Sequence, residues 1–550
     1  MLPDDRDGTA VGGPQPRREP MFKLEERTIQ KVLDRNAATW GAKAALRYED
    51  QTLSYEELAV VADRRGSALR GLGIAWQERF LLMLDNHLDH VLTWLGATYH
   101  GRVQVQVNTA YRGSLLTHVV NDADAETIVI EDDYCARLAA IADAIPKLRR
   151  VIVRGGEGAA LPPGRFEVLR FEDVLLDGPS GGPEQEVHPW DVYGILYTSG
   201  TTGNSKGVVI PHGQPYYFVS PEYFGLADSD DTVLVTLPQF HISGQWAGVM
   251  AALVVGGTAA LVDRFSASRF WEDVRRFGAT HTTLVSTMAD FLYRQPPRSD
   301  DADTPLRRIQ MAPVIREVDE FKRRFGLEVC VGLGQTEAAA PVIAPYGTTK
   351  PGACGWPRPD FEVRLVDEHD REVEPGAVGE LILRPTEPWS VMLEYHRQPE
   401  ATREKWRNLW LHTGDLLRQG QDGQLFFVDR NNDAIRRRGE NISSYEVEME
   451  IRSHGEVAEV AVIGVPSANY EYEVKACVRL IAGATIDQAR LHDHLRERLP
   501  YFMVPRYIEF VDEFAKTSTE RINKVVLREQ GMTEATWDAR AHGLEARHGS

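Results

Sequence analysis

The stretch YTSGTTGNSKG (197–207) directly follows an apolar run from Val192 to Leu196. Its glycines let the main chain approach a ligand closely, its hydroxyls and amides can donate hydrogen bonds, and Lys206 adds a positive charge. This combination is typical of a loop that wraps phosphate oxygens. A mobile Gly/Ser/Thr loop is the plainer interpretation, but the spacing is unusually specific.

The stretch is not a Walker A motif, because that motif has Gly directly before the Lys and Ser or Thr directly after it. Here Ser205 precedes Lys206 and Gly207 follows it. The pattern therefore disfavours a P-loop NTPase or a kinase.

On both sides of the loop, from about residue 28 to 430, short apolar runs alternate with helical patterns. Examples are RFLLML (79–84), HVLTWLGATYHG (90–101), RVQVQV (102–107), ETIVIED (126–132) and RRVIVRG (149–155). Such alternation predicts an α/β fold with parallel sheets buried on both faces. The sequence Ser54-Tyr-Glu-Glu57 is a capping box that predicts the start of a helix. Residues 232–262 lack Asp, Glu, Lys and Arg, yet proline and glycines interrupt them, which favours strand, turn, buried helix and strand over a membrane span.

The character of the chain changes after Asp429-Arg430, where it becomes polar and then forms shorter strands and amphipathic helices. We predict a disordered tail over residues 1–20, a large domain of stacked α/β subdomains over 21–430, and a small mobile α+β domain over 431–545. A hinge near Asn431 and Asn432 would join the two domains.

The 550 residues include 62 Lys+Arg and 81 Asp+Glu, a net charge of −19. This excess of negative charge argues against nucleic-acid and anionic-membrane partners, so a site for an anionic substrate needs a local concentration of positive charge. The first twenty residues resemble neither a signal peptide nor a membrane anchor. The four cysteines are scattered, which favours reduced thiols and a cytoplasmic protein.

Further segments accompany the loop in a characteristic order: LPQFHISG (237–244), GLGQTE (332–337), GELIL (379–383), WLHTGD (410–415), DRNNDAIRRRGENISSYEVE (429–448) and KTSTERINK (516–524). Together with the loop they closely resemble the adenylate-forming (ANL) superfamily, in the form of its acyl-CoA synthetases, over nearly the whole chain. The segments FHISG (240–244) and FSASRFW (265–271) look most like the carnitine/crotonobetaine-CoA ligase branch.

The resemblance implies a reaction in two halves. A small acid attacks the α-phosphorus of ATP and pyrophosphate leaves, and then an acceptor, most often coenzyme A, displaces AMP. The implied cofactors are ATP, Mg²⁺ and coenzyme A, with small molecules as the acid and the acceptor. Negative charge moves in both halves, so fixed donors and cations should dominate catalysis.

The resemblance also implies roles for individual residues. Thr336 would contact the α-phosphate, Glu337 would hold Mg²⁺, and His241 would form a gate between the ATP and acyl pockets. The β,γ-phosphates would be held by Thr198, Ser199, Gly200, Thr201, Thr202 and Lys206, and the rest of the nucleotide by Gly334, Gln335, Asp415 and Arg430. The acyl pocket would be walled by residues around His241, Gly244, Met311, Gly332 and Ala338.

Each of these residues has a plainer interpretation when taken alone. Thr336-Glu337 could cap a helix, Asp415 could be a turn residue, His241 a core histidine and Arg430 a surface ion pair. Their occurrence together, in the family's order, favours the functional interpretation. The pairs His87/His90 and His492/His494 lack further ligands, and we expect them to be solvated.

The chain departs from the family pattern at three places. Arg521, after Glu520, stands where the family has a lysine that reaches the acid and the nucleotide, and an arginine fork does not replace a compact ammonium. Leu333 stands where a tyrosine often stacks on adenine, and Asn432 occupies the hinge position. Two interpretations of the basic run 436–438 stay open: contact with a nucleotide phosphate, such as that of coenzyme A, or a solvated face.

The leading hypothesis is an ATP-dependent, AMP-forming acid:CoA ligase. The altered segment around Arg521 keeps two alternatives open. One is a secondary-metabolism enzyme that adenylates nitrite and delivers it to an aryl amine, and the other is a nucleotide-binding pseudo-enzyme. The oligomeric state is open, and a homodimer would be ordinary.

Overall fold

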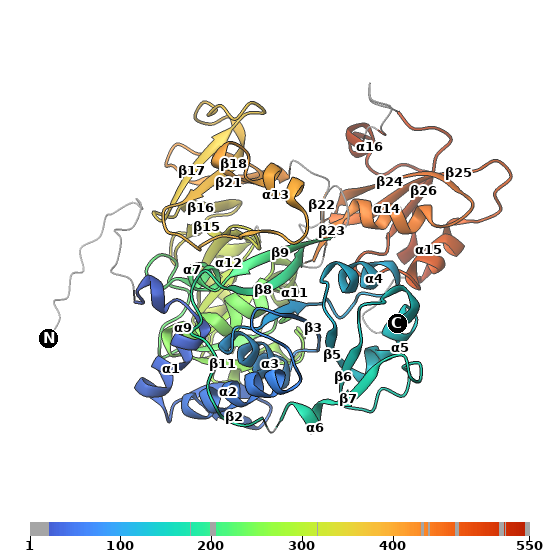
Figure 1. Cartoon of the computed structure of the whole chain (residues 1–550). Helices are drawn as coiled ribbons and strands as arrows, with labels where there is room; N and C mark the ends of the chain where they lie inside the picture. The colour runs from blue at the N-terminus through green and yellow to red at the C-terminus, as the bar shows by residue number, and fades with distance from the viewer. Residues whose placement is uncertain are drawn as a thin grey trace.

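The computed structural model describes residues 21–176, 178–198, 205–315, 317–430, 434–437, 440–467, 472–515, 522 and 524–544. The tail predicted for residues 1–20 and the hinge predicted at Asn431 and Asn432 lie outside these ranges. Figure 1 shows a large N-terminal domain with a smaller C-terminal domain beside it.

An eight-stranded sheet carries the strand that leads into the 197–207 loop. Its order is β19-β9-β8-β4-β3-β5-β6-β7, and β8 to β7 run parallel while β9 and β19 are antiparallel. The strands are β3 (Arg79–Met83), β4 (Val103–Gln106), β5 (Thr127–Glu131), β6 (Arg150–Arg154), β7 (Glu167–Arg170), β8 (Val192–Thr198), β9 (Lys206–Pro211) and β19 (Glu394–Tyr395). Every residue of β4 and β5 is buried, as expected for a parallel sheet covered on both faces.

The first half of the chain also forms helices, among them the one predicted after Ser54. Ser54 caps α2 by accepting from the Glu57 amide, while the Glu57 side chain accepts from the Ser54 amide, so the predicted capping box is present. The elements are η1 (Leu24–Glu26), α1 (Ile29–Trp40), α2 (Tyr55–Gly71), α3 (Leu88–Tyr99), α4 (Gly113–Asp122), η2 (Asp132–Tyr134), α5 (Cys135–Ala139), η3 (Ala142–Ala144), α6 (Phe171–Val174) and α7 (Gly213–Val219).

The second sheet has thirteen strands in the order β17-β18-β20-β21-β16-β15-β14-β13-β12-β10-β11-β1-β2. Neighbouring strands from β14 to β1 are parallel, and neighbouring strands from β14 to β17 are antiparallel. The alternation of strands and helices in the sequence does not predict the antiparallel half of the sheet. The parallel half and its edge are β1 (Ala44–Tyr48), β2 (Gln51–Ser54), β10 (Thr232–Val235), β11 (Thr258–Leu261), β12 (His281–Leu284), β13 (Arg308–Met311) and β14 (Glu328–Gln335). The antiparallel half adds β15 (Ala339–Ala344), β16 (Ala353–Pro357), β17 (Phe361–Val366), β18 (Val378–Pro385), β20 (Leu411–Gln419) and β21 (Leu425–Arg430).

The uncharged stretch 232–262 forms β10, a buried helical segment and β11, as predicted. Among the described residues no helix has the length and apolar character needed to cross a membrane. The helical elements around this sheet are α8 (Ile242–Gly244), η4 (Gln245–Met250), α9 (Ala251–Val255), α10 (Phe270–Phe277), α11 (Ser286–Tyr293), α12 (Val318–Phe325), α13 (Pro399–Lys405) and η5 (Arg407–Leu409).

The C-terminal domain begins with a hairpin of β22 (Ala434–Arg437) and β23 (Glu440–Ser443). A four-stranded sheet follows, β24 (Val457–Pro466), β25 (Tyr472–Leu480), β26 (Tyr507–Phe510) and β27 (Trp537–Asp538), with α14 (Ser444–Arg452), α15 (Gln488–Arg496), α16 (Lys524–Gln530) and η6 (Ala539–His542). The mixture of short strands and helices matches the predicted α+β character.

Two predictions for isolated residues have different outcomes. All four cysteines are free thiols, as predicted, and all are buried. The histidine prediction is wrong, because His87, His90 and His492 are buried. His87 contacts Glu131 at 2.5 Å and His90 contacts Gln106 at 2.9 Å, so neighbouring strand ends supply the polar partners that the sequence pattern did not reveal.

Candidate active site

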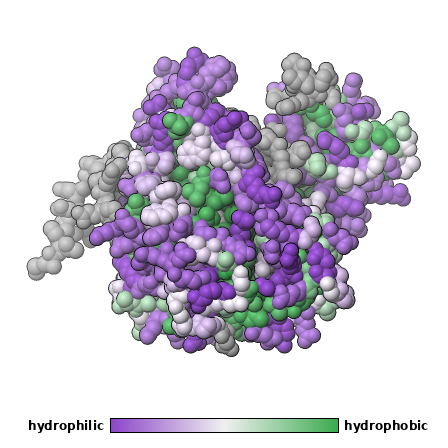
Figure 2. Space-filling model, in the orientation of Figure 1, coloured by the Kyte–Doolittle hydropathy of each residue, from purple (hydrophilic) through white to green (hydrophobic). Residues whose placement is uncertain are grey.

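A cavity of about 2840 Å³ lies between the two domains and is lined by residues of both. In Figure 2 the visible face is mostly hydrophilic and is notched between the lobe that carries β17 and β18 and the C-terminal domain. The N-terminal domain contributes the ends of β4, β8, β14 and β20 to the lining.

The 197–207 loop joins two paired antiparallel strands, with Thr198 at the end of β8 opposite Lys206 at the start of β9. Both residues line the cavity. A β-carbon at Gly207 would lie 2.8 Å from the Ile195 side chain, so only glycine fits there. Ser199, Gly200, Thr201 and Thr202 lie outside the described residues.

Lys206 and Glu337 both lie next to Tyr395. The Lys206 ammonium is 5.1 Å from the centre of the Tyr395 ring, and the Tyr395 hydroxyl donates to Glu337 Oε1 at 2.7 Å. Burial lowers the pKa of Lys206, an effect that the Glu337 carboxylate opposes and the positive charge of Lys405 reinforces. An ammonium group that burial destabilises in this way is stabilised when an anion binds beside it.

Gln335 and Asp415 form a second polar group in the same cavity. Gln335 Nε2 donates to Asp415 Oδ2 at 2.6 Å and to the Thr413 carbonyl at 2.9 Å, and Lys405 Nζ donates to Gln335 Oε1 at 3.4 Å. Asp415 is almost fully buried, so its carboxylate can accept strong hydrogen bonds from a ligand. The main chain of Arg430 pairs with that of Asp415, while the Arg430 side chain lies outside the described part.

The turn after β14 connects the two groups. The Thr336 carbonyl accepts from Gln214 Nε2 at 2.7 Å, and the Glu337 carbonyl accepts from the Met392 amide at 2.9 Å. A β-carbon at Gly334 would lie 2.4 Å from the Ala339 carbonyl oxygen. The turn is thus held at both ends, and Gly334, Gln335, Thr336 and Glu337 all line the cavity.

Glu337 fits a magnesium ion that bridges phosphates. Mg²⁺ commonly takes one or two carboxylates and completes its shell with water and phosphate oxygens. Among the described residues no group of three or more His, Cys, Asp or Glu could hold a metal by itself. A single carboxylate facing a cavity next to Lys206 agrees with a metal that needs the nucleotide as a co-ligand.

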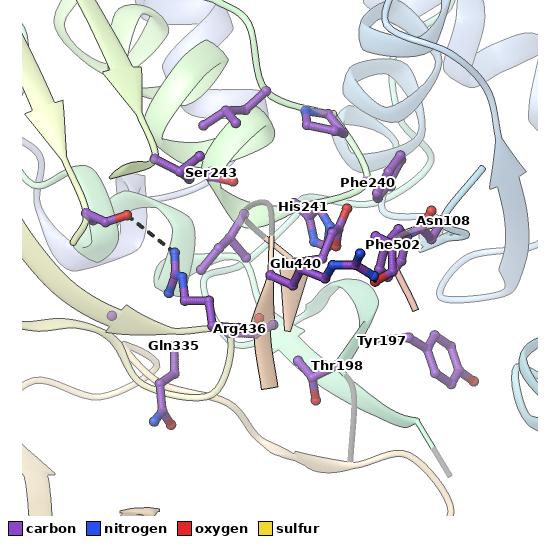
Figure 3. Close-up of a pocket in the computed structure, with 18 of the residues that line it drawn as sticks. Asn108, Tyr197, Thr198, Phe240, His241, Ser243, Gln335, Arg436, Glu440 and Phe502 are labelled. Carbon is purple, nitrogen blue, oxygen red and sulfur yellow. Dashed lines mark hydrogen bonds and ion pairs between the residues drawn. The ribbon is translucent and has the colours of Figure 1, made fainter. Parts of the chain in front are cut away.

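His241 meets the C-terminal domain inside the cavity (Figure 3). Its Nε2 lies 2.8 Å from Glu440 Oε2 on the β22–β23 hairpin, and Arg436 on the same hairpin donates to the Ala312 carbonyl at 3.3 Å. Burial acts to lower the pKa of His241, but the attraction of Glu440 outweighs it and raises the pKa. The contact between His241 and Glu440 therefore holds the hairpin against the N-terminal domain.

A second contact holds α14 against Ser205, near the end of the 197–207 loop. Glu446 Oε1 accepts from the Ser205 amide at 2.7 Å and from the Ser205 hydroxyl, and His118 Nε2 donates to the Ser205 carbonyl at 2.8 Å. Burial raises the pKa of Glu446 to about 7, although the hydrogen bonds from Ser205 act in the opposite direction. The Glu446 carboxyl of the C-terminal domain thus accepts the hydrogen bond of the backbone amide that precedes Lys206.

The contact between Glu446 and Ser205 should make domain docking depend on pH. An undocked, exposed carboxyl would titrate near 4.5, so docking is strongest below that pH, weakens as the pH rises to about 7 and then levels off. The pKa shift of Glu446 corresponds to about 3 kcal/mol of docking free energy. Glu446→Gln should remove the part of this dependence that comes from Glu446 and leave the part that comes from the His241–Glu440 contact, as measured by energy transfer between dyes on the two domains from pH 5 to 8. Glu529→Gln, the same charge change at an exposed position, is the control. An unchanged pH profile in Glu446→Gln would contradict the assignment.

The three sequence departures have separate outcomes. Arg521 and Asn432 lie outside the described residues. Leu333 lines the cavity, so apolar contact is retained there. In the basic run, Arg437 is buried and donates to the Phe502 and Val504 carbonyls at 2.9 and 2.7 Å, which gives it a structural task in place of the predicted phosphate contact.

The predicted acyl-pocket wall needs correction. His241 and Gly332 line the cavity, but Gly244, Met311 and Ala338 do not. Neighbouring residues of a strand face opposite sides, so on β13 Met311 is buried in the core while Gln310 lines the cavity.

Several site residues were missed by the sequence analysis. Glu440 and Glu446 lie inside the quoted 429–448 segment, whose two acidic positions could have been singled out. Tyr395 and Lys405 belong to no recognised motif, and only the pairing of β19 with β9 and the position of α13 bring them to the cavity.

Comparison with known proteins agrees with this geometry. The profile of the AMP-binding enzymes matches residues 33–396, and that of the AMP-binding enzyme C-terminal domain matches residues 446–521. The crotonobetaine/carnitine–CoA ligase of Salmonella agona (strain SL483) is 28% identical over 520 residues, covering 91% of this chain and 98% of the relative.

Two solved structures are similar over almost their whole length. The anthranilate CoA ligase AuaEII in complex with anthranoyl-AMP has a TM-score of 0.69 and 25% identity, covering 92% of this chain and 98% of that one. The amide bond synthetase McbA from Marinactinospora thermotolerans has a TM-score of 0.78 and 25% identity, covering 91% and 99%. With its fold, its two profile matches and its cavity, the chain belongs to the AMP-binding enzymes, the adenylate-forming superfamily, and is of the acyl-CoA synthetase type.

Proposed function

We propose that the protein activates a small carboxylic acid with ATP, releases pyrophosphate, and transfers the acyl group from AMP to coenzyme A. The convergence of Lys206, Glu337 and Asp415 on one cavity between the domains carries this proposal. The CoA ligase names among the similar proteins support coenzyme A as the acceptor. A cytoplasmic location and a homodimer remain predictions of the sequence.

Lys206, Asp415 and Glu337 would each bind a different part of the ATP–magnesium complex. Lys206 would neutralise the β,γ-phosphates, Asp415 would accept from the ribose hydroxyls, and Glu337 would hold Mg²⁺. The metal would supply positive charge to the leaving pyrophosphate. The adenylation core over 21–430 and the mobile domain over 431–545 would move about the hinge near Asn432 between the two halves.

The acyl side of the cavity favours an acid that carries a hydrogen-bond acceptor. Thr283 donates to Gln310 Oε1 at 3.1 Å, which leaves the Gln310 amide nitrogen as the donor for a ligand. That nitrogen is 3.3 Å from the place where a β-carbon would stand at Gly332, so the glycine opens the space in front of it. Both residues line the cavity.

Gln310→Leu should therefore change the acid preference. We expect kcat/KM to fall about 10–100-fold for a hydroxy-substituted benzoate, whose oxygen can accept from the amide, and to stay within a few-fold for unsubstituted benzoate, because a lost polar contact discriminates only between acids that use it. Parallel acid titrations in the pyrophosphate-release assay measure both. An equal fall in kcat/KM for both acids would show that Gln310 does not contact the substituent.

The proposed function is tested by AMP and pyrophosphate release across a panel of carboxylic acids, with coenzyme A or amines as separate acceptors. We expect acid-dependent pyrophosphate release, and a thioester only when coenzyme A is present. Formation of ADP, or no acyl-AMP with any acid, would overturn the proposal. Among the described residues of the site nothing favours the nitrite alternative. Nitrite with an aryl amine is included as a separate arm, whose activity would replace the carboxylate assignment.

A further inference from the structure

Lys405, the last residue of α13, places a second ammonium group in the cavity. Its side chain is half-buried and lines the cavity. The helix is attached to the N-terminal domain, because Thr402 Oγ1 accepts from the Tyr395 amide of β19 at 2.9 Å. The position of Lys405 therefore does not depend on where the C-terminal domain stands.

The Lys405 ammonium lies between two parts of the site that have different predicted tasks. Its Nζ donates to Gln335 Oε1 and to the Thr413 carbonyl, each at 3.4 Å. Gln335 directly precedes Thr336, which is predicted to contact the α-phosphate. Thr413 is two positions before Asp415, which is predicted to accept from the ribose. The α-phosphate joins the ribose to the rest of ATP, so an ammonium between these parts would stand beside the α-phosphate.

The protein does not neutralise the charge of Lys405. Within the ranges that the structure describes, no carboxylate forms an ion pair with it, and its two hydrogen bonds go to uncharged oxygens. The acidic side chains on this side of the cavity have other partners. Glu404 and Glu380 pair with Arg407 at 2.9 and 3.1 Å, and Asp415 accepts from a neutral amide at 2.6 Å.

Lys405 and Lys206 are the two lysines that line the cavity in the described part of the chain. The positive charge of Lys405 contributes to the lowered pKa of Lys206, while the Glu337 carboxylate opposes that shift. Two ammonium groups that repel each other are both stabilised by an anion that binds between them. A triphosphate whose far end is at Lys206 and whose α-end is at Lys405 would meet this requirement.

The described lysine nearest to Arg521 in the sequence is not available for this task. Lys524 Nζ donates to Ser444 Oγ at 2.8 Å and pairs with Glu448 at 2.7 Å, and it does not line the cavity. These contacts hold it inside the C-terminal domain. At the family's lysine position this chain has an arginine, whose planar fork does not replace a compact ammonium.

We propose that Lys405 is a catalytic residue that contacts the α-phosphate, so that the core domain supplies the ammonium which the family pattern places on the C-terminal domain. This inference rests on the proposed function, which supplies ATP and the acid. In adenylation an acid oxygen forms a bond to the α-phosphorus, and the bond from that phosphorus to the bridging oxygen of pyrophosphate breaks. No proton moves, and the ammonium stays charged while it reduces the repulsion between the two anions.

A cation on the core domain acts in both halves of the reaction. When the thiolate of coenzyme A attacks the acyl carbon, the bond from that carbon to the AMP oxygen breaks, and negative charge grows on the same phosphate. Lys405 would still be beside it. A lysine on the mobile domain would act only in the half-reaction for which that domain brings it to the phosphate.

The test compares Lys405→Met with Arg521→Met and Arg403→Met in the full chain. Arg403 is the matched control, because it lies on the same helix, is 80% exposed and is outside the cavity. Adenylation is measured by acid-dependent exchange of labelled pyrophosphate into ATP, and acyl transfer by a single turnover of preformed acyl-AMP with coenzyme A. We expect Lys405→Met to lower both rates about 10²-fold at saturating substrate, and the other two variants to stay within about 10-fold of the wild type.

Three results would overturn the inference. The first is a Lys405→Met enzyme with both rates close to those of the wild type. The second is a rise in the KM for ATP with an unchanged kcat, which would show that Lys405 only orients Gln335. The third is a larger loss of adenylation in Arg521→Met than in Lys405→Met.

Calorimetric binding of AMP and adenosine separates this inference from the proposed function, because AMP carries only the α-phosphate and adenosine carries none. Lys405→Met should weaken AMP binding about 10–100-fold and leave adenosine binding unchanged. If the wild type adenylates no acid and this difference is found, the Lys405 contact is supported while the proposed function fails. Equal AMP affinities of the wild type and Lys405→Met, or a wild type that binds AMP no more tightly than adenosine, would refute the contact.

Discussion

Glu337→Gln is expected to lower kcat for acid-dependent pyrophosphate release by about 10²–10³-fold. The substitution keeps the shape of the side chain and an oxygen that can accept from the Tyr395 hydroxyl, which now bonds Glu337 at 2.7 Å. It removes only the negative charge that would hold Mg²⁺ beside Lys206. The rate should be measured at saturating acid over a titration of Mg²⁺, and the variant should need more metal.

The matched control for this result is Tyr395→Phe. It removes the hydroxyl that orients the carboxylate but leaves the charge, so we expect a loss of less than about 10-fold. The pair of variants separates the charge of Glu337 from its position. If Glu337→Gln keeps a rate close to that of the wild type at low Mg²⁺, the metal-binding role of Glu337 is wrong.

Arg358→Met is expected to destabilise the N-terminal domain by about 3–5 kcal/mol. Arg358 and Asp360 are both almost fully buried and pair through two contacts of 3.0 and 2.6 Å. Arg358 also donates to the Tyr217 carbonyl at 2.8 Å, which ties α7 to the sheet. Removal of the arginine leaves the Asp360 carboxylate buried without its cation.

The double variant Arg358→Met/Asp360→Leu tests the cause of that loss. Replacing both charges by apolar groups of similar size removes the stranded carboxylate, so most of the lost stability should return. The midpoints of urea unfolding, followed by circular dichroism, compare the variants. Equal midpoints for the single and double variants would show that lost packing, and not an unpaired charge, causes the effect.

Much of the fold follows from local patterns in the chain. Buried parallel strands appear as short apolar runs, and the Ser54–Glu57 capping box begins α2 as expected. The resemblance that the polar motifs carry also implied that Lys206, Glu337 and Asp415 serve one site, and all three line the same cavity. The antiparallel half of the large sheet was not predicted, since its strands have no distinctive period of their own.

The details of the site depend on contacts that local patterns do not contain. Residues around Met311 were predicted to wall the acyl pocket; its neighbour Gln310 lines the cavity and Met311 itself does not, because neighbouring residues of a strand face opposite sides. His87 and His90 were expected in solvent and are buried, because their partners come from other strands.

The sequence by itself determined the class of fold and the family of the chain, and it predicts that the 197–207 loop binds phosphate. These depend on residue type and spacing, which are local properties. The tertiary structure alone decided that Tyr395 orients Glu337, that Glu440 and Glu446 join the domains at His241 and Ser205, and that Lys206 and Lys405 share a cavity. Those pairings join residues that are distant in the chain, up to 241 positions apart for Glu446 and Ser205, so only the packing of the sheets and domains brings their charges together.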